Sequence, residues 1–298
     1  MTRRRHTAGQ RPPGARAADV VEALPLGERW LPDAFRVIPG PGGFVLRQVD
    51  MTQAKVALGL LRSRGVRATF THVIVRAVAL ALARNPELQQ MVCRYRRLTP
   101  GGVDIGLSMA GRTTYAPVVV IPEAHRKPLG VLAQAVDELV SLARDKETRD
   151  LESMRRRGRW IPFGFLRRAL LRLLQRTFWF RRRLAGTFQV SCLSGADVGA
   201  PFLFYTGSVL CAGSVRDRVV AVGGEAVVRP TVWLTVCADH AAMDGRRVAK
   251  LLKAVKAVLE GDELVREARE AGAPHATAAT PPRVPGPPST PEPAPEAA

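Results

Sequence analysis

Residues 231–245, TVWLTVCADHAAMDG, predict both a fold element and a reactive group. Residues 231–237 form the most apolar strand pattern of the chain, because β-branched and aromatic side chains dominate them. A helical pattern then opens at Asp244 and continues to residue 259. The stretch therefore predicts a buried strand that turns directly into a helix, with His240 at the junction.

Strand and helix patterns follow one another along the rest of the sequence. Thr52 and Thr71 are expected N-caps, and Asn85-Pro86 should end the second helix. This succession predicts an α+β domain with a mixed sheet. The expected strands are 44–50, 103–109, 115–121, 186–193, 208–215, 218–222 and 225–237, and the expected helices are 52–65, 71–85, 128–146 and 245–259.

The two ends of the 298-residue chain differ from its middle in composition. The first residues are rich in Arg, Gly and Pro, and the last are rich in Pro and Ala, so neither end can bury enough apolar surface to fold. We expect disordered tails at 1–24 and 263–298 around one catalytic domain at 25–262. No run of 18 apolar residues occurs, and no signal-peptide pattern follows the first arginines, so no membrane span or export is expected.

The formal net charge of +19 indicates a surface that attracts anions. An Arg-rich proteome explains such a charge as well as coenzyme A, anionic lipid or nucleic acid would, although no known nucleic-acid-binding motif is present. The four cysteines are single and form no C-x-x-C pair, which favours a reducing cytoplasm and indicates no metal site.

Eleven arginines alternate with aromatic and aliphatic residues between positions 155 and 183. Arg168, Arg172 and Arg176 are four apart and share one side of a helix, while leucines including Leu170 occupy the other. A helix packed on the core or on another subunit with a solvated Arg side explains this pattern. Contact with an anionic membrane surface, or phosphate binding, remains open.

Five histidines are present, and His240 is the best candidate for a general base. It ends a buried strand where a ligand can reach it, and an imidazole suits proton transfer near neutral pH. A structural histidine beside the capping Asp244 would give the same local pattern. The spacing alone leaves both interpretations open.

Several segments resemble one family in the same order along the chain. The 239–245 stretch resembles the signature of chloramphenicol acetyltransferases and of the catalytic domains of dihydrolipoyl acyltransferases. Residues 186–191, GTFQVS, resemble the family's G-T-F-T-I-S strand, 103–106, VDIG, resemble V-N-I-G, and Val49-Asp50 resembles an early V-D. The resemblance extends from about residue 25 to 262.

The resemblance implies an α/β fold, a two-layer α+β sandwich with a mixed sheet, and CoA-dependent acyl transfer. His240 would remove the acceptor's proton, Ser191 would stabilise the oxyanion, and Asp244 would hold the loop. Acyl-CoA would be a co-substrate without a tightly bound cofactor. A homotrimer is implied, with His240 and Ser191 from neighbouring subunits.

The same comparison leaves the acceptor open, since a thiol, hydroxyl or amine would serve. No lipoyl attachment domain is expected in this chain, so a dihydrolipoyl acceptor would come from a separate protein. Ala241 replaces the usual Arg, and Cys192 the common Asn. These departures keep two alternatives: a catalytically weakened trimeric scaffold, and a basic protein that binds membrane surfaces or nucleic acid.

Overall fold

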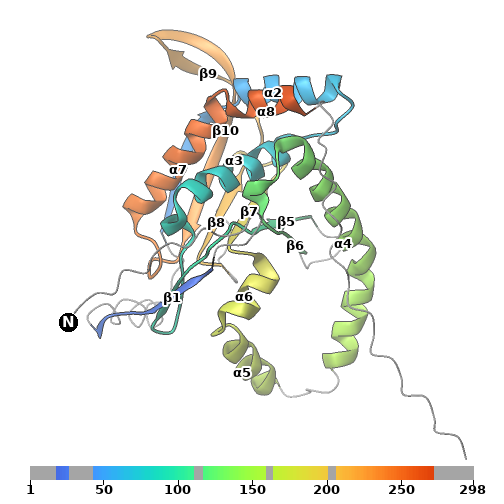
Figure 1. Ribbon diagram of the computed structural model, residues 1–298, viewed down its shortest axis with the longest axis vertical. Helices are drawn as coiled ribbons and strands as arrows, with labels where there is room; N and C mark the ends of the chain where they lie inside the picture. Colours follow the sequence, from blue (N-terminus) through green and yellow to red (C-terminus); the bar gives the residue numbers. More distant parts are fainter. Residues whose placement is uncertain (1–17, 27–42, 111–116, 159–163, 201–205, 272–298) are drawn as a thin grey trace, which may run out of the picture.

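The computed structural model describes residues 18–26, 43–110, 117–158, 164–200 and 206–271. Its centre is a seven-stranded sheet in the order β2-β10-β8-β7-β5-β6, with β9 paired to β10 (Figure 1). β7 is parallel to β5 and β8, while the other pairs are antiparallel. The strands are β2 (Phe44–Asp50), β5 (Ile105–Ser108), β6 (Val118–Ile121), β7 (Phe188–Cys192), β8 (Ser208–Ala212), β9 (Arg216–Val222) and β10 (Glu225–Ala238).

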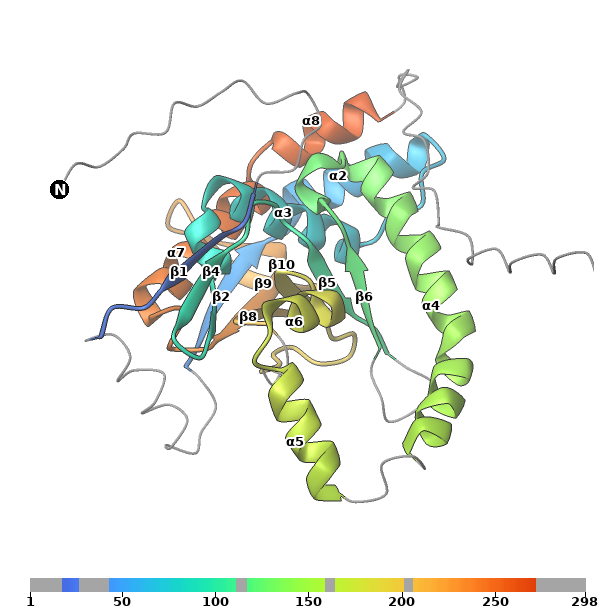
Figure 2. The ribbon, with the colours of Figure 1, turned by 60° about the horizontal axis from the view of Figure 1, so that its bottom comes forward.

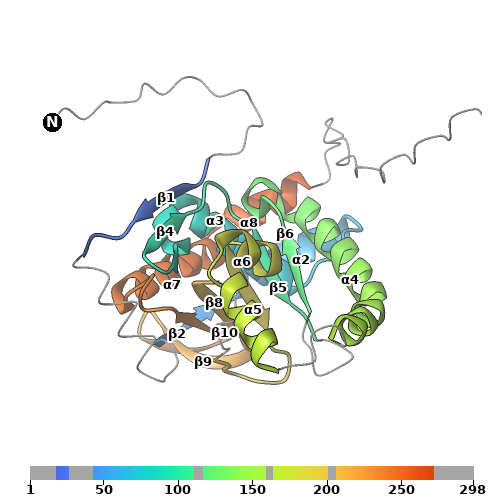
Figure 3. The ribbon, with the colours of Figure 1, turned by 90° about the horizontal axis from the view of Figure 1, so that it is seen from below.

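Helices pack on one face of this sheet. Val232, Leu234 and Val236 of β10 point into the core, as their alternation predicts. Figures 1 and 3 show the helices gathered on this side, which confirms the mixed α/β arrangement. They are α2 (Thr52–Ser63), α3 (Phe70–Arg84), α4 (Leu129–Gly158), α7 (Gly245–Glu260) and α8 (Glu263–Glu270), with short 3-10 turns η2 (Pro86–Gln89) and η3 (Ala124–Arg126) between them.

The opposite face of the sheet is exposed along β2 and buried at Thr235 and Cys237 of β10. On β2, Phe44 is 55% exposed and Leu46 is 38% exposed. They pair with Cys237 and Thr235 of β10, so all four share this face. We call it the open face of the sheet.

A second sheet, β1-β4-β3, was not predicted. β1 (Val20–Ala23) pairs with β4 (Arg96–Thr99), which pairs with β3 (Met91–Cys93). Pairing therefore extends the folded domain into the predicted tail at 1–24. The first 17 residues lie outside the described part.

The predicted tail at 263–298 also needs correction at its start, since α8 occupies Glu263–Glu270. Leu264, Val265 and Ala268 are buried in the main core. Glu267 receives two hydrogen bonds from the Arg76 Nε, at 2.9 and 3.1 Å. These contacts make α8 part of the domain.

Both predicted N-caps are shifted. The N-cap of α2 is Met51 rather than Thr52, and Asp50 Oδ1 accepts the Thr52 N–H at 2.8 Å. α3 begins one residue before Thr71, with Thr69 as its N-cap. In each case the capping group precedes the predicted threonine.

The Arg-rich stretch forms the end of α4 and two further helices, α5 (Gly164–Leu174) and α6 (Phe178–Ala185). α4 extends to Gly158, past the predicted end at residue 146. Figure 2 shows α4 and α5 reaching away from the sheets on the same side. Among the described residues, no helix is long and apolar enough to cross a membrane.

Candidate active site

His240 lies on a tight turn between β10 and α7. Asp239 Oδ1 accepts the Ala241 N–H at 3.0 Å, and the Asp239 carbonyl accepts the N–H groups of Ala242 and Met243 at 2.8 and 2.9 Å. The three residues after His240 are buried, whereas His240 is exposed. Its neighbours therefore fix the backbone while the imidazole faces solvent.

Asp244 completes this turn as the N-cap of α7. Its Oδ1 accepts the Arg247 N–H at 2.8 Å, which satisfies a donor that the first helical turn leaves open. The side chain is exposed. Asp244 thus fixes the direction in which the chain leaves His240.

Ser191 lies on the open face of the sheet. Phe188 and Val190 of β7 point into the core, so Ser191 points the other way. It is half-buried and lies opposite Ser108 and Cys211 on the neighbouring strands. Its hydroxyl makes no hydrogen bond to any residue in the described part of the chain, and it can donate to a ligand.

His240 and Ser191 do not meet within one subunit. Ser191 of β7 is paired with Cys211 of β8, and Cys211 is paired with Thr235 of β10. Thr235 therefore lies two strands away from Ser191 at the same position along the strands. Asp239 is four residues further along, so strand rise and spacing place its Cα roughly 15 Å from that of Ser191. The two side chains cannot act on one carbonyl from a single chain.

A polar pair that the sequence did not single out adjoins Ser191. Gln189 Nε2 donates to Ser108 Oγ at 2.6 Å. Gln189 is 8% exposed, and its Oε1 has no partner among the described residues. The only sequence signal was the alternation of Gln189 and Ser191 along one strand.

The cysteines near this face are poor nucleophiles. Burial raises the pKa of Cys192 to about 11 and that of Cys211 to about 12, and it also raises the pKa of Cys237. A thiol with such a pKa stays protonated at neutral pH. Covalent catalysis by these thiols is therefore disfavoured.

Ala241 and Cys192, the two residues that differ from the family pattern, have side chains that point into the protein. Ala241 is buried with Leu24, Val92 and Ala242 in a small cluster that joins the turn to the second sheet. Cys192 packs against the main core. Neither substitution therefore removes a side chain from the solvent-exposed side of the turn at His240 or from the open face at Ser191.

The glycines of two motif segments are structural. A Cβ on Gly106 would lie 2.2 Å from the Ala185 carbonyl oxygen, and one on Gly186 would lie 2.3 Å from that of Asp104. Gly186 also has a φ of +70°. Both segments therefore need glycine where β5 meets the start of β7.

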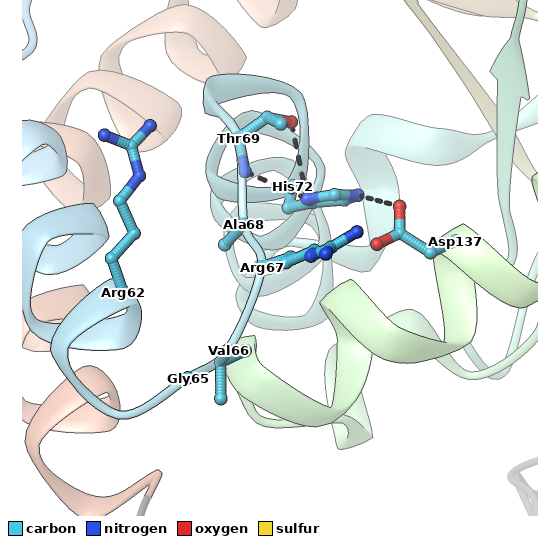
Figure 4. Close-up of a pocket in the computed structure, with 8 residues that line it drawn as sticks. All are labelled: Arg62, Gly65, Val66, Arg67, Ala68, Thr69, His72 and Asp137. Atoms are coloured by element: carbon cyan, nitrogen blue, oxygen red, sulfur yellow. Dashed lines mark hydrogen bonds and ion pairs between the residues drawn. The ribbon is translucent and has the colours of Figure 1, made fainter.

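A separate depression of about 510 Å³ lies at the start of α3 (Figure 4). His72 Nδ1 accepts the Thr69 N–H at 3.1 Å, and His72 Nε2 lies 3.4 Å from Asp137 Oδ1. Burial lowers the pKa of His72, although Asp137 opposes this. His72 is thus a buried capping residue, and Figure 4 shows Arg67 beside this pair and Arg62 pointing away.

The model of the 2-oxoacid dehydrogenases acyltransferase (catalytic domain) family matches residues 43–155 and 185–266. The chain belongs to this family. Residues 156–184 lie between the matched parts.

Two curated relatives are dihydrolipoyllysine-residue acyltransferases. The acetyltransferase component of the Bacillus subtilis acetoin cleaving system is 30% identical over 201 residues, which are 66% of this chain and 42% of that protein. The mitochondrial succinyltransferase component of the Mus musculus 2-oxoglutarate dehydrogenase complex is 36% identical over 78 residues, 25% of this chain and 17% of that protein. The chain thus spans less than half the length of each relative.

Solved structures confirm the fold. The probable dihydrolipoamide acetyltransferase of Listeria monocytogenes aligns with a TM-score of 0.58 at 20% identity, over 83% of this chain and 91% of that one. The Azotobacter vinelandii dihydrolipoamide acetyltransferase gives 0.58 at 18% identity, over 82% and 93%.

Proposed function

We propose that this protein is a CoA-dependent acyltransferase whose site is completed by a neighbouring subunit of a homotrimer. His240 acts as general base and Ser191 of the next subunit as oxyanion donor. The observation that carries the proposal is the turn at 239–243, which leaves His240 exposed four residues before the N-capping Asp244 in a chain of the acyltransferase family.

The spacing of these residues supports their roles. The Azotobacter vinelandii enzyme was studied for the catalytic roles of a serine, a histidine and an asparagine, of which the last two are four positions apart. His240 and Asp244 have the same separation, with Asp244 in the place of the asparagine. Asp244 positions His240 through the start of α7.

The reaction follows from these groups. His240 takes the proton of the acceptor's thiol, hydroxyl or amine, and the freed electron pair attacks the thioester carbonyl of acyl-CoA. The Ser191 hydroxyl donates to the resulting oxyanion, a contribution of about 2.7–4 kcal/mol for one such donor. Collapse breaks the carbon–sulfur bond, and the leaving CoA thiolate receives the proton from His240.

The open face supplies a reason for assembly. Ser191 shares it with Phe44 and Leu46, whose exposed side chains would be covered by a second subunit. A dihydrolipoyl group on a separate protein is one acceptor consistent with the relatives. The cytoplasm is the proposed compartment, since all four cysteines are unpaired.

A catalytically weakened scaffold is the second candidate, favoured by Ala241 and Cys192. Both residues point inward, which makes them weak arguments for lost activity. The deciding experiment measures free-thiol release from acetyl-CoA and longer acyl-CoAs, with dihydrolipoamide and simple acceptors, for the wild type and His240→Ala. Turnover that falls about 10²-fold or more in the variant supports the proposal, and a wild type without turnover or CoA binding supports the scaffold.

A further inference from the structure

Helices α5 and α6, which we call the helical arm, expose a group of large apolar side chains. Phe165, Leu170, Leu173 and Trp179 are 60%, 42%, 62% and 67% exposed. Figures 1 and 2 show α5 projecting away from both sheets. Of the two packing arrangements expected for this segment, the structure excludes packing on the core of the same chain, and packing on another subunit stays a prediction. Single exposed apolar residues are common, but a group of this kind marks an interaction site.

Three exposed leucines lie on one side of α5. Leu166, Leu170 and Leu173 follow one another at intervals of four and three residues, which places them on one stripe of the helix. Arg168 and Arg172, also four apart, lie on the other side, and Phe165 adjoins them. The helix therefore has a leucine stripe and a cationic side.

No acidic residue occurs between positions 153 and 196, although this stretch contains eleven arginines. Two copies of the arm would repel each other, so contact between the arms of two subunits is unfavourable. An apolar surface bordered by arginines is instead complementary to an anionic bilayer, whose interior accepts the leucines while its headgroups accept the guanidinium groups.

The arm is fixed to the domain through α6. Arg181 Nη1 donates to the Val92 carbonyl at 3.0 Å, and Arg182 Nη2 donates to Asp104 Oδ2 at 3.1 Å. Arg183 lies over the Trp179 ring, 5.5 Å from its centroid. The family match omits 156–184, so the arm is additional to the shared fold.

We propose that the helical arm docks the protein on an anionic membrane surface, with α5 lying in the plane of the interface. Leu166, Leu170 and Leu173 enter the boundary of the acyl chains, and Trp179 lies at the headgroup level. The arginines bind the lipid phosphates. The proposal does not depend on the acyltransferase activity.

The test is flotation of the full chain with phosphatidylcholine vesicles that contain 30% phosphatidylglycerol, and with phosphatidylcholine vesicles alone, at 100 mM NaCl. We expect flotation with the anionic vesicles alone, and an affinity at least about tenfold lower for Leu173→Asp and for Arg168→Ser/Arg172→Ser. Trp179→Phe should remove most of the blue shift in tryptophan emission on binding.

Two matched variants control for general effects of charge and polarity. Leu142→Asp changes a leucine of α4 that is 54% exposed, and Arg62→Ser/Arg67→Ser removes two exposed arginines outside the arm. Both should float like the wild type. A wild type that does not float with anionic vesicles overturns the proposal. A Leu173→Asp variant that binds these vesicles as tightly as Leu142→Asp also overturns it.

Discussion

The turn at 239–243 and the helical arm present their side chains in opposite ways. In the turn, backbone bonds to Asp239 and three buried neighbours hold one polar side chain, His240, toward solvent. In the arm, α5 exposes several apolar side chains at once, and α6 is bonded to the domain through Arg181. The turn lies inside the family match and the arm outside it. We therefore expect changes at the proposed site to alter turnover, and changes in the arm to alter attachment alone.

The largest loss of turnover is expected from a substitution at Ser191, on the open face of the sheet. Ser191→Ala should lower kcat by about 10²- to 10³-fold with little change in KM, because the hydroxyl donates mainly in the transition state. Ser108→Ala, on the adjacent strand, is the control and should cost about tenfold or less. Steady-state kinetics with acyl-CoA separate the two, and equal losses would remove Ser191 from its proposed role.

Loss of the helix cap at Asp244 should lower the free energy of unfolding, and it should lower turnover less than Ser191→Ala does. Asp244→Ala removes the acceptor of the Arg247 N–H, which should lower the free energy of unfolding by about 0.5–2 kcal/mol. Asp244→Asn keeps an amide oxygen that can cap the helix and should retain most of that stability. Urea denaturation tests this, and an Asn variant as unstable as the Ala variant would contradict the capping role.

Stability should also respond to pH through His72. Because burial lowers its pKa in the folded protein, the unfolded chain binds more protons once the pH falls below the usual value of about 6.5. The free energy of unfolding should therefore decrease as the pH falls from 7 toward 5, and His125, whose pKa burial also lowers, acts in the same direction. Urea denaturation at several pH values should show a shallower decrease for His72→Gln. An unchanged pH dependence would exclude His72 as a contributor.

The smallest change in turnover is expected from a substitution in the helical arm, measured with substrates that are soluble in water. Leu173→Asp should change turnover of acyl-CoA with a water-soluble acceptor by no more than about twofold, because Leu173 is exposed and lies outside the family match. Leu142→Asp is again the matched control. A large loss of turnover in Leu173→Asp but not in Leu142→Asp would show that the arm takes part in catalysis. The turn and the arm would then not have separate functions.

The elements with clear periodicity were predictable from the sequence. β10, α3 and α7 combine long apolar patterns with recognisable ends, and the structure confirms them within a few residues. β3 and β4 were missed, since three- and four-residue strands around Arg94 and Tyr95 show no alternation. α8 was hidden because its eight residues adjoin a proline-rich segment whose composition decided the domain boundary.

The same limit applies to the sites. His240 was found because its signature is continuous in sequence, whereas its separation from Ser191 depends on the order and register of β7, β8 and β10. For the arm, the spacing of the leucines predicted an amphipathic helix. It could not tell whether the apolar side would be buried, since a core-packed helix and an interfacial helix share that pattern.

The central claim, a site shared between subunits, is tested most directly by co-expressing His240→Ala and Ser191→Ala chains with different affinity tags. Each variant alone lacks one group at every site, but random mixing in a trimer restores both groups at about a quarter of the sites. We predict that mixed assemblies regain about a quarter of wild-type turnover, while a His240→Ala/Ser191→Ala double variant mixed with His240→Ala chains regains none. Mixed assemblies that stay as inactive as the single variants, beside an active wild type, would contradict the account.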